Sequence, residues 1–440
     1  MRMSKKKPQK TNKVELLAPA KNFMSIKASG PYADAIYFGV QSFNMRAKSD
    51  NFKIEDLKRI AKICHNPQNK EFRKRKCYLT TNILIYEEEL DELREVIQSA
   101  KDAGIDAVIV HDAAAIKIAK EIGIPFHIST QCNVSNSMSA QFYEGLGAER
   151  IILARECSLR QIKRISKKLS TAEIETFVHG AMCSSISGRC YLSQVINCSV
   201  KDSANRGRCT QPCRGNWKLI AADGHEFLYD GQKILNSRDM CMIKYVPQMI
   251  QSGIKSFKIE GRMRDAFYVE IVSKAYREAI DAYYDHQFRR AWKRKKWMSE
   301  LKKPYNRGFT TGFFFKRATV EDSQLNTGAN LSHWRAIEMG KVDSFLEKIN
   351  VAAITLTNGT LRVGDKITIK SMDPAYDTFF HQKVKDMRIK GKSVEKTDRA
   401  TEENPIQITL KVDEEVYPDQ IDAIYKFTDE TYGTGGYQLK

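Results

Sequence analysis

Four cysteines in the middle of the chain have the number and spacing of a metal site. Six residues separate Cys183 from Cys190, and eighteen more precede Cys209. Cys213 follows after another three. Four thiolates can complete the tetrahedral shell of zinc or hold the four irons of a 4Fe-4S cluster. Because the first pair is not a short Cys-x-x-Cys knuckle, the spacing favours an iron–sulfur cluster, with zinc or no metal as alternatives.

The remaining cysteines and the N-terminus suggest a reducing compartment. All ten cysteines lie between Cys64 and Cys241, and clustered cysteines in a cytoplasmic protein more often bind metal than form disulfides. Residues 1–13 carry six Lys or Arg and no acid, which predicts a disordered basic arm and not a secretory signal. We expect a cytoplasmic protein, with Cys241 as a reserve ligand. A Cys183–His179 nucleophile–base pair is the peptidase alternative.

Short β-rich segments alternate with helical patterns from residue 14 to about 285. Amphipathic stretches such as 88–103, 113–122 and 159–169 separate the strands. Repeated β-then-α units predict a parallel sheet, and eight units predict a (β/α)8-type barrel, complete or distorted. A doubly wound open sheet is the alternative. The expected strands are Val14–Ala20, Ala35–Val40, Cys77–Leu84, Ala107–His111, Phe126–Thr130, Ile151–Ala154, Ile174–Val178 and Ser256–Ile259.

Polar residues follow most of these strands. In a barrel they would meet at the C-terminal face, where such folds place their chemistry. The Cys-rich stretch, residues 180–249, falls between the last two strands and is too long for a simple connection, so we expect a functional insertion. The polar strand ends are Thr81-Asn82, His111-Asp112, Thr130-Gln131-Cys132-Asn133, Arg155-Glu156, His179-Gly180 and Glu260-Gly261-Arg262.

The second half of the chain is basic and then β-rich. Within the expected linker or helix 286–330, Lys295 and Lys296 stand between Trp292 and Trp297, a pattern typical of a nucleic-acid contact. The net charge of +19 also favours a polyanionic partner, and no apolar run is long enough to span a bilayer. Residues 331–428 predict a small β-barrel, with strands near 351–356, 366–369, 383–389 and 406–412, followed by a tail, 429–440.

Several motifs together resemble the collagenase-like peptidase family (class U, family thirty-two). Glu175–Ser193 matches its E-x-F-x-x-G-A-M-C-x6-C-x-x-S signature. Glu15–Ala20 is similar to its first strand, and Lys258–Arg262 to its late-strand motif. Asn306–Phe313 resembles the segment before the C-terminal barrel in the tRNA-hydroxylation branch.

The resemblance implies a hydroxylase instead of a peptidase. Its tRNA branch forms 5-hydroxyuridine at the wobble position, and related branches hydroxylate 23S rRNA or act in oxygen-independent ubiquinone synthesis. It implies a 4Fe-4S cluster on the four cysteines, prephenate as hydroxyl donor, and a C-terminal module resembling the second domain of translation factors. Expected partners are tRNA, no membrane, and an electron donor that the sequence does not identify.

On this hypothesis the strand-end residues divide into roles. His179 and Glu260 would handle protons, and Arg262 and Arg155 would bind the carboxylates of the donor. Hydrogen bonds to the base or donor would come from Asn82, Gln131 and Asn133. An rRNA hydroxylase of the same family, a metal- or Cys-dependent peptidase, and a non-catalytic zinc-containing RNA-binding protein remain the alternatives.

Overall fold

The computed structural model describes residues 13–47, 49–199, 202–227, 235–323 and 330–428. Nearly all of the predicted basic arm and the whole predicted tail, 429–440, lie outside the described residues. Among the helices that are described, none is both long and apolar enough to cross a membrane.

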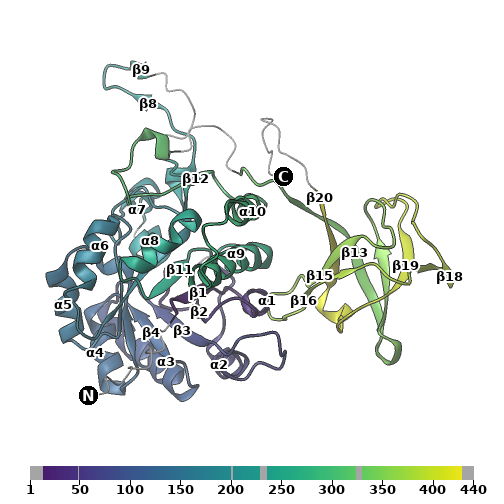
Figure 1. Cartoon of the computed structure of the whole chain (residues 1–440), viewed down its shortest axis with the longest axis horizontal. Helices are drawn as coiled ribbons and strands as arrows, with labels where there is room; N and C mark the ends of the chain where they lie inside the picture. Colours follow the sequence, from purple (N-terminus) through teal and green to yellow (C-terminus); the bar gives the residue numbers. More distant parts are fainter. Residues whose placement is uncertain (1–12, 48, 200–201, 228–234, 324–329, 429–440) are drawn as a thin grey trace, which may run out of the picture.

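Eight parallel strands form a closed barrel ringed by helices, on the left of Figure 1. The last of them, β11, pairs in parallel with both β1 and β7 and thereby closes the sheet. The predicted (β/α)8-type barrel is therefore confirmed, and the open-sheet alternative is wrong. The strands are β1 (Glu15–Pro19), β2 (Ala35–Phe38), β3 (Lys76–Thr81), β4 (Ala107–Val110), β5 (Phe126–Ile128), β6 (Arg150–Ile152), β7 (Glu173–Ala181) and β11 (Ser256–Ile259).

Local capping interactions mark the ends of the surrounding helices, as α4 shows. For α4, the Asp112 carboxylate accepts a hydrogen bond from the Ala114 amide, and Gly123 ends the helix at a φ of 75°. The helices of this part of the chain are α1 (Phe23–Ser29), α2 (Leu57–His65), α3 (Leu90–Asp102), α4 (Ala113–Ile122), α5 (Ser137–Gly145), α6 (Leu159–Ser166), α8 (Val246–Gln251), α9 (Ala266–Tyr284) and α10 (Ala291–Lys302).

A layer of ion-paired side chains fills the barrel interior near the N-terminal ends of the strands. Arg150 contacts Glu15, Glu173 at 2.8 Å and Glu175 at 3.2 Å. On the next level, the Lys258 ammonium lies 2.9 Å from the other oxygen of Glu175. Burial lowers the pKa of Lys258, and Glu175 opposes that effect. This layer forms a rigid, polar floor beneath the C-terminal mouth.

The Cys-rich insertion lies over that mouth. It contains α7 (Leu192–Ile196), the small hairpin of β8 (Leu219–Ile220) and β9 (Glu226–Phe227), and β10 (Asp239–Cys241), which pairs antiparallel with β7. Two glycines at positive φ allow its close approach. A side chain at Gly188 would collide with the Gln131 backbone, and one at Gly207 with the Asn44 backbone.

Residues 286–314 pack against the barrel. Phe288, Trp297, Leu301 and Phe314 all belong to the large apolar core of the first module. The segment predicted as a linker is therefore anchored to the barrel over this part of its length.

The C-terminal module is an eight-stranded antiparallel sheet around its own apolar core, on the right of Figure 1. This agrees with the expected β module. The two modules meet where Phe267 of α9 packs against Phe379 and Phe427, with ring centroids 5.2 and 4.6 Å apart. The strands are β13 (Arg335–Leu346), β14 (Val351–Leu356), β15 (Lys366–Ser371), β16 (Phe379–Lys383), β17 (Arg388–Ile389), β18 (Lys392–Ser393), β19 (Ile406–Lys411) and β20 (Asp422–Thr428).

Candidate active site

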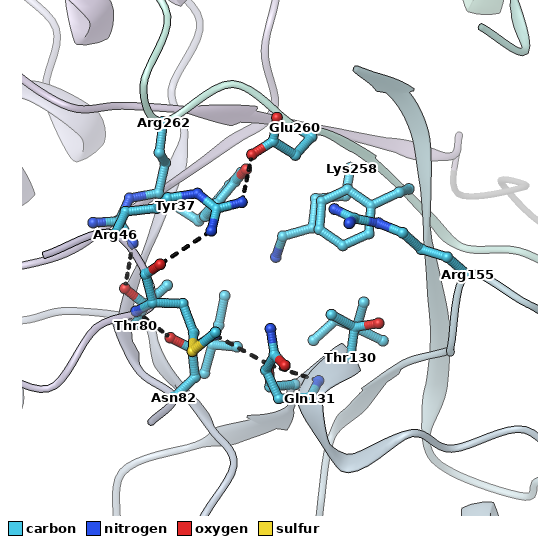
Figure 2. Close-up of a pocket in the computed structure, with 15 residues that line it drawn as sticks. Tyr37, Arg46, Thr80, Asn82, Thr130, Gln131, Arg155, Lys258, Glu260 and Arg262 are labelled. Atoms are coloured by element: carbon cyan, nitrogen blue, oxygen red, sulfur yellow. Dashed lines mark hydrogen bonds and ion pairs between the residues drawn. The ribbon is translucent and has the colours of Figure 1, made fainter. Parts of the chain in front are cut away.

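A polar cavity of about 70 Å³ opens at the C-terminal mouth of the barrel (Figure 2). This volume has room for several water molecules or a small polar ligand. Five of the seven strand-end residues with expected roles line it. The labelled lining residues are Tyr37, Arg46, Thr80, Asn82, Thr130, Gln131, Arg155, Lys258, Glu260 and Arg262.

Glu260 lies in this cavity as an ion-pair partner of Arg46, at 3.0 Å. Burial would raise the pKa of Glu260, but Arg46, with Arg155 and Arg264, outweighs it and lowers the pKa to about 2. At neutral pH the group is therefore a carboxylate, and its ion pair holds Arg46 at the cavity edge. Its expected proton-handling role stays a prediction.

Glu260→Gln should destabilise the protein by roughly 2–3 kcal/mol at pH 7, because Arg46 loses a charged partner. Because the folded-state pKa is depressed, the carboxylate stabilises the fold above its unfolded pKa, about 4.3. That contribution is lost as the pH falls toward about 2. Chemical denaturation of both proteins checks this: their difference should shrink below about pH 4.5. A difference independent of pH would contradict the ion pair.

Arg262 is the most enclosed cation of the cavity. Its Nη1 donates to Thr80 at 3.0 Å, and its Nη2 donates to Asn44 at 2.9 Å and Asn51 at 2.6 Å. Gly39 permits this placement, because a Cβ there would collide with the guanidinium. With most N–H groups committed to the protein, Arg262 chiefly joins the loop after β2 to β3. Its predicted role as a carboxylate anchor stays a prediction.

Arg155 differs from Arg262 in its hydrogen bonding. Its guanidinium stacks 4.1 Å from the centroid of Phe177 and has no hydrogen-bond or ion-pair partner among the described residues. Figure 2 shows it beside Lys258 on one wall of the cavity. The Gln131 side-chain amide also faces the cavity without a partner among the residues that the structure describes. These two groups can bind an anionic, hydrogen-bonding ligand.

The two asparagines predicted at the site differ. Asn82 lines the cavity and is held by hydrogen bonds from the Met45 amide, at 3.3 Å, and to the Ser129 hydroxyl, at 3.1 Å. Asn133 does not line it: its amide donates to the Ser187 carbonyl at 3.0 Å. Asn133 thus fixes the loop between the first two cysteines, and its predicted contact with a base or donor is corrected.

His179 is outside the cavity. It is buried among the rings of Tyr268, Tyr276 and Phe309, with centroids 5.5 to 6.0 Å away. Burial, helped by Arg264, lowers its pKa to about 3. The prediction of a catalytic histidine, or of a Cys183–His179 pair, is wrong because a neutral, enclosed imidazole cannot exchange protons with a ligand in the cavity.

The insertion gathers the four predicted thiols above the cavity. Burial raises the pKa of Cys213, Arg214 opposes this, and the thiols of Cys183, Cys209 and Cys190 raise it further. The other three thiols are therefore each within electrostatic reach of Cys213. Cys241, the reserve ligand, is instead buried in β10 beside Tyr276 and is not among the thiols that act on Cys213.

Cys209 is bonded within the insertion and lies within electrostatic reach of Arg46 on the cavity wall. Its sulfur accepts hydrogen bonds from the Gln211 amide at 3.4 Å and the Ser193 hydroxyl at 3.6 Å. Burial lowers the pKa of Arg46, but Glu260, Tyr37 and the thiol of Cys209 outweigh burial and raise it. Arg46 is thus the link between the cysteine group and the cavity wall.

The sequence matches the profile of Peptidase family U32 over residues 24–324. The chain belongs to Peptidase family U32. An "Uncharacterized protease" of Methanocaldococcus jannaschii is 41% identical over 87% of this chain and 92% of its own length. The "Collagenase" of Porphyromonas gingivalis is 35% identical over 94% and 98%. The "tRNA hydroxylation protein P1" of Bacillus subtilis is 34% identical over 93% and 94%.

Beside the barrel of this U32 protein, α10 borders a basic hollow of about 530 Å³. None of its described lining residues is acidic, and its cations have no ion-pair partners within the described ranges. Lys296 points elsewhere and lies 3.7 Å from Glu278. The basic hollow is lined by Lys244, Arg294, Lys295, Met298, Ser299, Lys302 and His333.

The two tryptophans of α10 lie on different faces. Trp292 is 58% exposed, so it can still meet a base. Trp297 is 2% exposed, and its Nε1 donates to Glu278 at 2.9 Å. The prediction that Trp297 stacks on a nucleic-acid base is wrong, because the indole anchors α10 to α9.

Sequence reasoning missed several lining residues of the U32 cavity, and four of them have charged or aromatic side chains: Tyr37, Arg46, Phe177 and Lys258. Arg46 carried a signal, because Asn44 and Arg46 follow the second strand as polar residues follow the others. Tyr37, Phe177 and Lys258 lie within strands, where only the inward alternation of barrel residues would have indicated them.

Proposed function

We propose that this U32 chain is an RNA hydroxylase that forms 5-hydroxyuridine at the wobble position of tRNA in the cytoplasm. The observation that carries the proposal is the juxtaposition of a four-thiol group with a cationic cavity. That cavity contains the Arg155 guanidinium, which has no partner among the described residues. Similarity to "tRNA hydroxylation protein P1" over nearly both full lengths, C-terminal module included, supports tRNA over rRNA.

A 4Fe-4S cluster fits the thiol group better than zinc. Tetrahedral zinc at 2.3 Å from each sulfur would bring the sulfurs to about 3.8 Å from one another. No three of Cys183, Cys190, Cys209 and Cys213 lie within 4.8 Å of one another. The wider arrangement suits thiolates that each bind a different iron. Such a cluster would supply electron transfer or Lewis acidity beside the cavity.

The cavity residues would bind a hydroxyl donor with carboxylates, for which the family resemblance implies prephenate. Arg155 can form two parallel hydrogen bonds with one carboxylate, and Gln131 can donate to a second oxygen. Exchange of the hydrogen on uracil C5 for the donor's hydroxyl balances atoms and electrons, because the donor leaves carrying the hydrogen. The ion pair with Glu175 keeps Lys258 in place at the bottom of the cavity.

The reacting uridine must leave the anticodon stack to reach this mouth, since base chemistry requires an extruded base. Met45 and Phe177, both in the cavity lining, provide apolar surface for its ring. Asn82 keeps Met45 in place through its backbone hydrogen bond. Because the cavity has room for only one small ligand, the base would approach the donor from the opening of the cavity.

The basic hollow would bind tRNA phosphates. Replacing both Arg294 and Lys295 with Ala should weaken tRNA binding and reduce the slope of log affinity against log salt by roughly 1.5, since each phosphate contact contributes about 0.7–0.9. Lys296→Ala should have the smaller effect because Glu278 already neutralises it. Fluorescence anisotropy over a salt series measures the slope.

A matched control is the double change Lys117→Ala and Lys120→Ala on α4, which removes two exposed cations from another side of the barrel. Equal loss of slope in this control would mean that charge, and not the hollow, determines binding. An unchanged slope in the Arg294 and Lys295 variant would rule out the hollow as the tRNA contact.

A peptidase is the second candidate because two relatives carry protease or collagenase names. A Cys peptidase needs a thiol and an imidazole within hydrogen-bond reach. No histidine lines the cavity among the described residues, and the Cys–His contact that the structure does contain, Cys77–His65, is at the other end of the barrel with Cys77 fully buried. The geometry therefore favours the hydroxylase.

Mass spectrometry of tRNA nucleosides tests the proposal. Deleting the gene from its host, with any redundant pathway removed, should abolish 5-hydroxyuridine and its derivatives. Normal levels in that strain would refute the proposed function, and loss of a hydroxycytidine from rRNA instead would favour the rRNA alternative.

A further inference from the structure

A second group of metal-binding side chains lies at the N-terminal face of the barrel, opposite the cavity. Within the described residues, His65, Cys77 and Asp106 are the three that bring their ligand atoms within 4.8 Å of one another. His65 ends α2, Cys77 begins the buried part of β3, and Asp106 directly precedes β4. The end of α2 and the starts of the paired strands β3 and β4 therefore meet at this point.

The distances within this group are close to those of a metal shell. The His65 Nε2 lies 2.9 Å from Asp106 Oδ2, the Cys77 Sγ lies 3.4 Å from the same oxygen, and 3.9 Å separates Sγ from Nε2. Around tetrahedral zinc, donors of these types would lie roughly 3.3–3.6 Å apart. Changes of about half an ångström, within the reach of side-chain rotation, would complete the shell.

A fourth donor and a balancing charge are at hand. The thiol of Cys64, also fully buried, is hydrogen-bonded to that of Cys77. Arg75 is buried beside both thiols, and its Nε and Nη2 have no hydrogen-bond partner among the described residues. Two thiolates, one carboxylate, a divalent cation and one guanidinium sum to zero net charge, which is what a buried site requires.

We propose that His65, Cys77 and Asp106, with Cys64 as the adjacent fourth donor, bind one divalent cation of the zinc type. Mixed sulfur, nitrogen and oxygen donors suit a borderline-soft cation such as Zn²⁺ better than Mg²⁺ or Ca²⁺. Asp106 also lines an open hollow on this face, which provides a path for the ion. The cation would join α2 to the starts of β3 and β4 and stabilise the barrel.

The same residue types could suggest a Cys–His–Asp catalytic triad, but the geometry is different. In a triad the acid and the nucleophile contact opposite nitrogens of the imidazole. Here Asp106 and Cys77 both face Nε2 of His65. A carboxylate and a thiol directed at one nitrogen surround a point in space, as ligands do around a metal.

The test uses the full chain with Cys183, Cys190, Cys209 and Cys213 all changed to Ser, so that zinc cannot enter the other site. After incubation with Zn²⁺ and desalting, elemental analysis should find about one zinc per chain, with an unfolding midpoint higher by about 5 °C. Adding His65→Gln or Asp106→Asn should lower zinc about tenfold, in line with loss of a ligand. Cys157→Ser, a buried cysteine elsewhere, is the matched control.

Should the four-serine protein fail to fold, Co²⁺ binding to the otherwise unchanged chain replaces it. In His65→Gln, the absorbance of tetrahedral, thiolate-bound Co²⁺ should fall by the amount that corresponds to one ion per chain. A folded protein without zinc, metal content indifferent to His65 and Asp106, or a Cys64–Cys77 disulfide in anaerobically prepared protein would each overturn the proposal. None of these results depends on hydroxylase activity.

Discussion

Cys209→Ser should abolish the visible absorption of the proposed iron–sulfur cluster in anaerobically purified protein, and should lower 5-hydroxyuridine formation by more than about 100-fold. The reason is the position of this thiol: it accepts two hydrogen bonds within the insertion and acts on Arg46 at the cavity wall. Losing it would remove a ligand and disturb the contact between the cysteine group and the cavity. Absorption spectra, iron content and tRNA nucleoside analysis measure the effect together.

Cys198→Ser is the matched control. Cys198 lies in the same insertion and is exposed. Within the described residues, its thiol makes one hydrogen bond, to a backbone carbonyl. It should retain iron, colour and activity. If Cys198→Ser and Cys209→Ser lost iron equally, or if Cys209→Ser kept its cluster, the assignment of the ligands would be wrong.

Arg155→Met should reduce kcat/KM for the carboxylate donor by roughly 10- to 100-fold while leaving tRNA affinity unchanged. The magnitude is that of one charge-assisted hydrogen bond, about 1.5–3 kcal/mol. Arg155 is singled out because its guanidinium lies on Phe177 and has no partner among the described residues. Steady-state kinetics with the donor varied, and tRNA binding measured separately, distinguish the two effects.

Arg155→Lys should recover only part of the loss, because an ammonium keeps the charge but not the planar fork. Arg160→Met removes an exposed cation from the neighbouring helix α6 and should behave as wild type. A loss of tRNA affinity in Arg155→Met, with the donor KM unchanged, would place the donor elsewhere.

Much of the fold could be predicted because its signals are local. All eight barrel strands coincide with apolar segments separated by amphipathic stretches. Eight such strands are the number that closes a barrel, so the pairing of β11 with β1 and β7 could also be expected. The course of the insertion could not be predicted. Its placement depends on contacts such as Gly188 on Gln131 and Gly207 on Asn44, which join residues distant in sequence.

His179 shows why site prediction failed where it did. Phe177 pairs with Lys258, but the register then shifts so that His179 pairs with Ile259. Strict alternation from Phe177, which lines the cavity, would have turned His179 inward as well. The irregularity instead turns it toward Tyr276 on α9. A one-residue bulge leaves no trace in the composition of a strand.

The prediction for Trp297 on the basic helix α10 failed for a related reason. Its many cations hide an inward face on which Trp297 and Leu301, four residues apart, are fully buried. Spacing alone could not separate Trp297 from the exposed Trp292. Arg155, by contrast, was predictable, since a polar residue just after a barrel strand belongs to the mouth.

The most direct test of the proposed chemistry is reconstitution of the anaerobically purified chain with unmodified tRNA and prephenate carrying an ¹⁸O-labelled hydroxyl. Mass spectrometry of the digested tRNA should show 5-hydroxyuridine containing the label at the wobble position, with Cys209→Ser inactive. Unmodified uridine in the presence of folded, cluster-loaded protein would contradict the account. Unlabelled 5-hydroxyuridine would keep the reaction but exclude prephenate as the source of the hydroxyl.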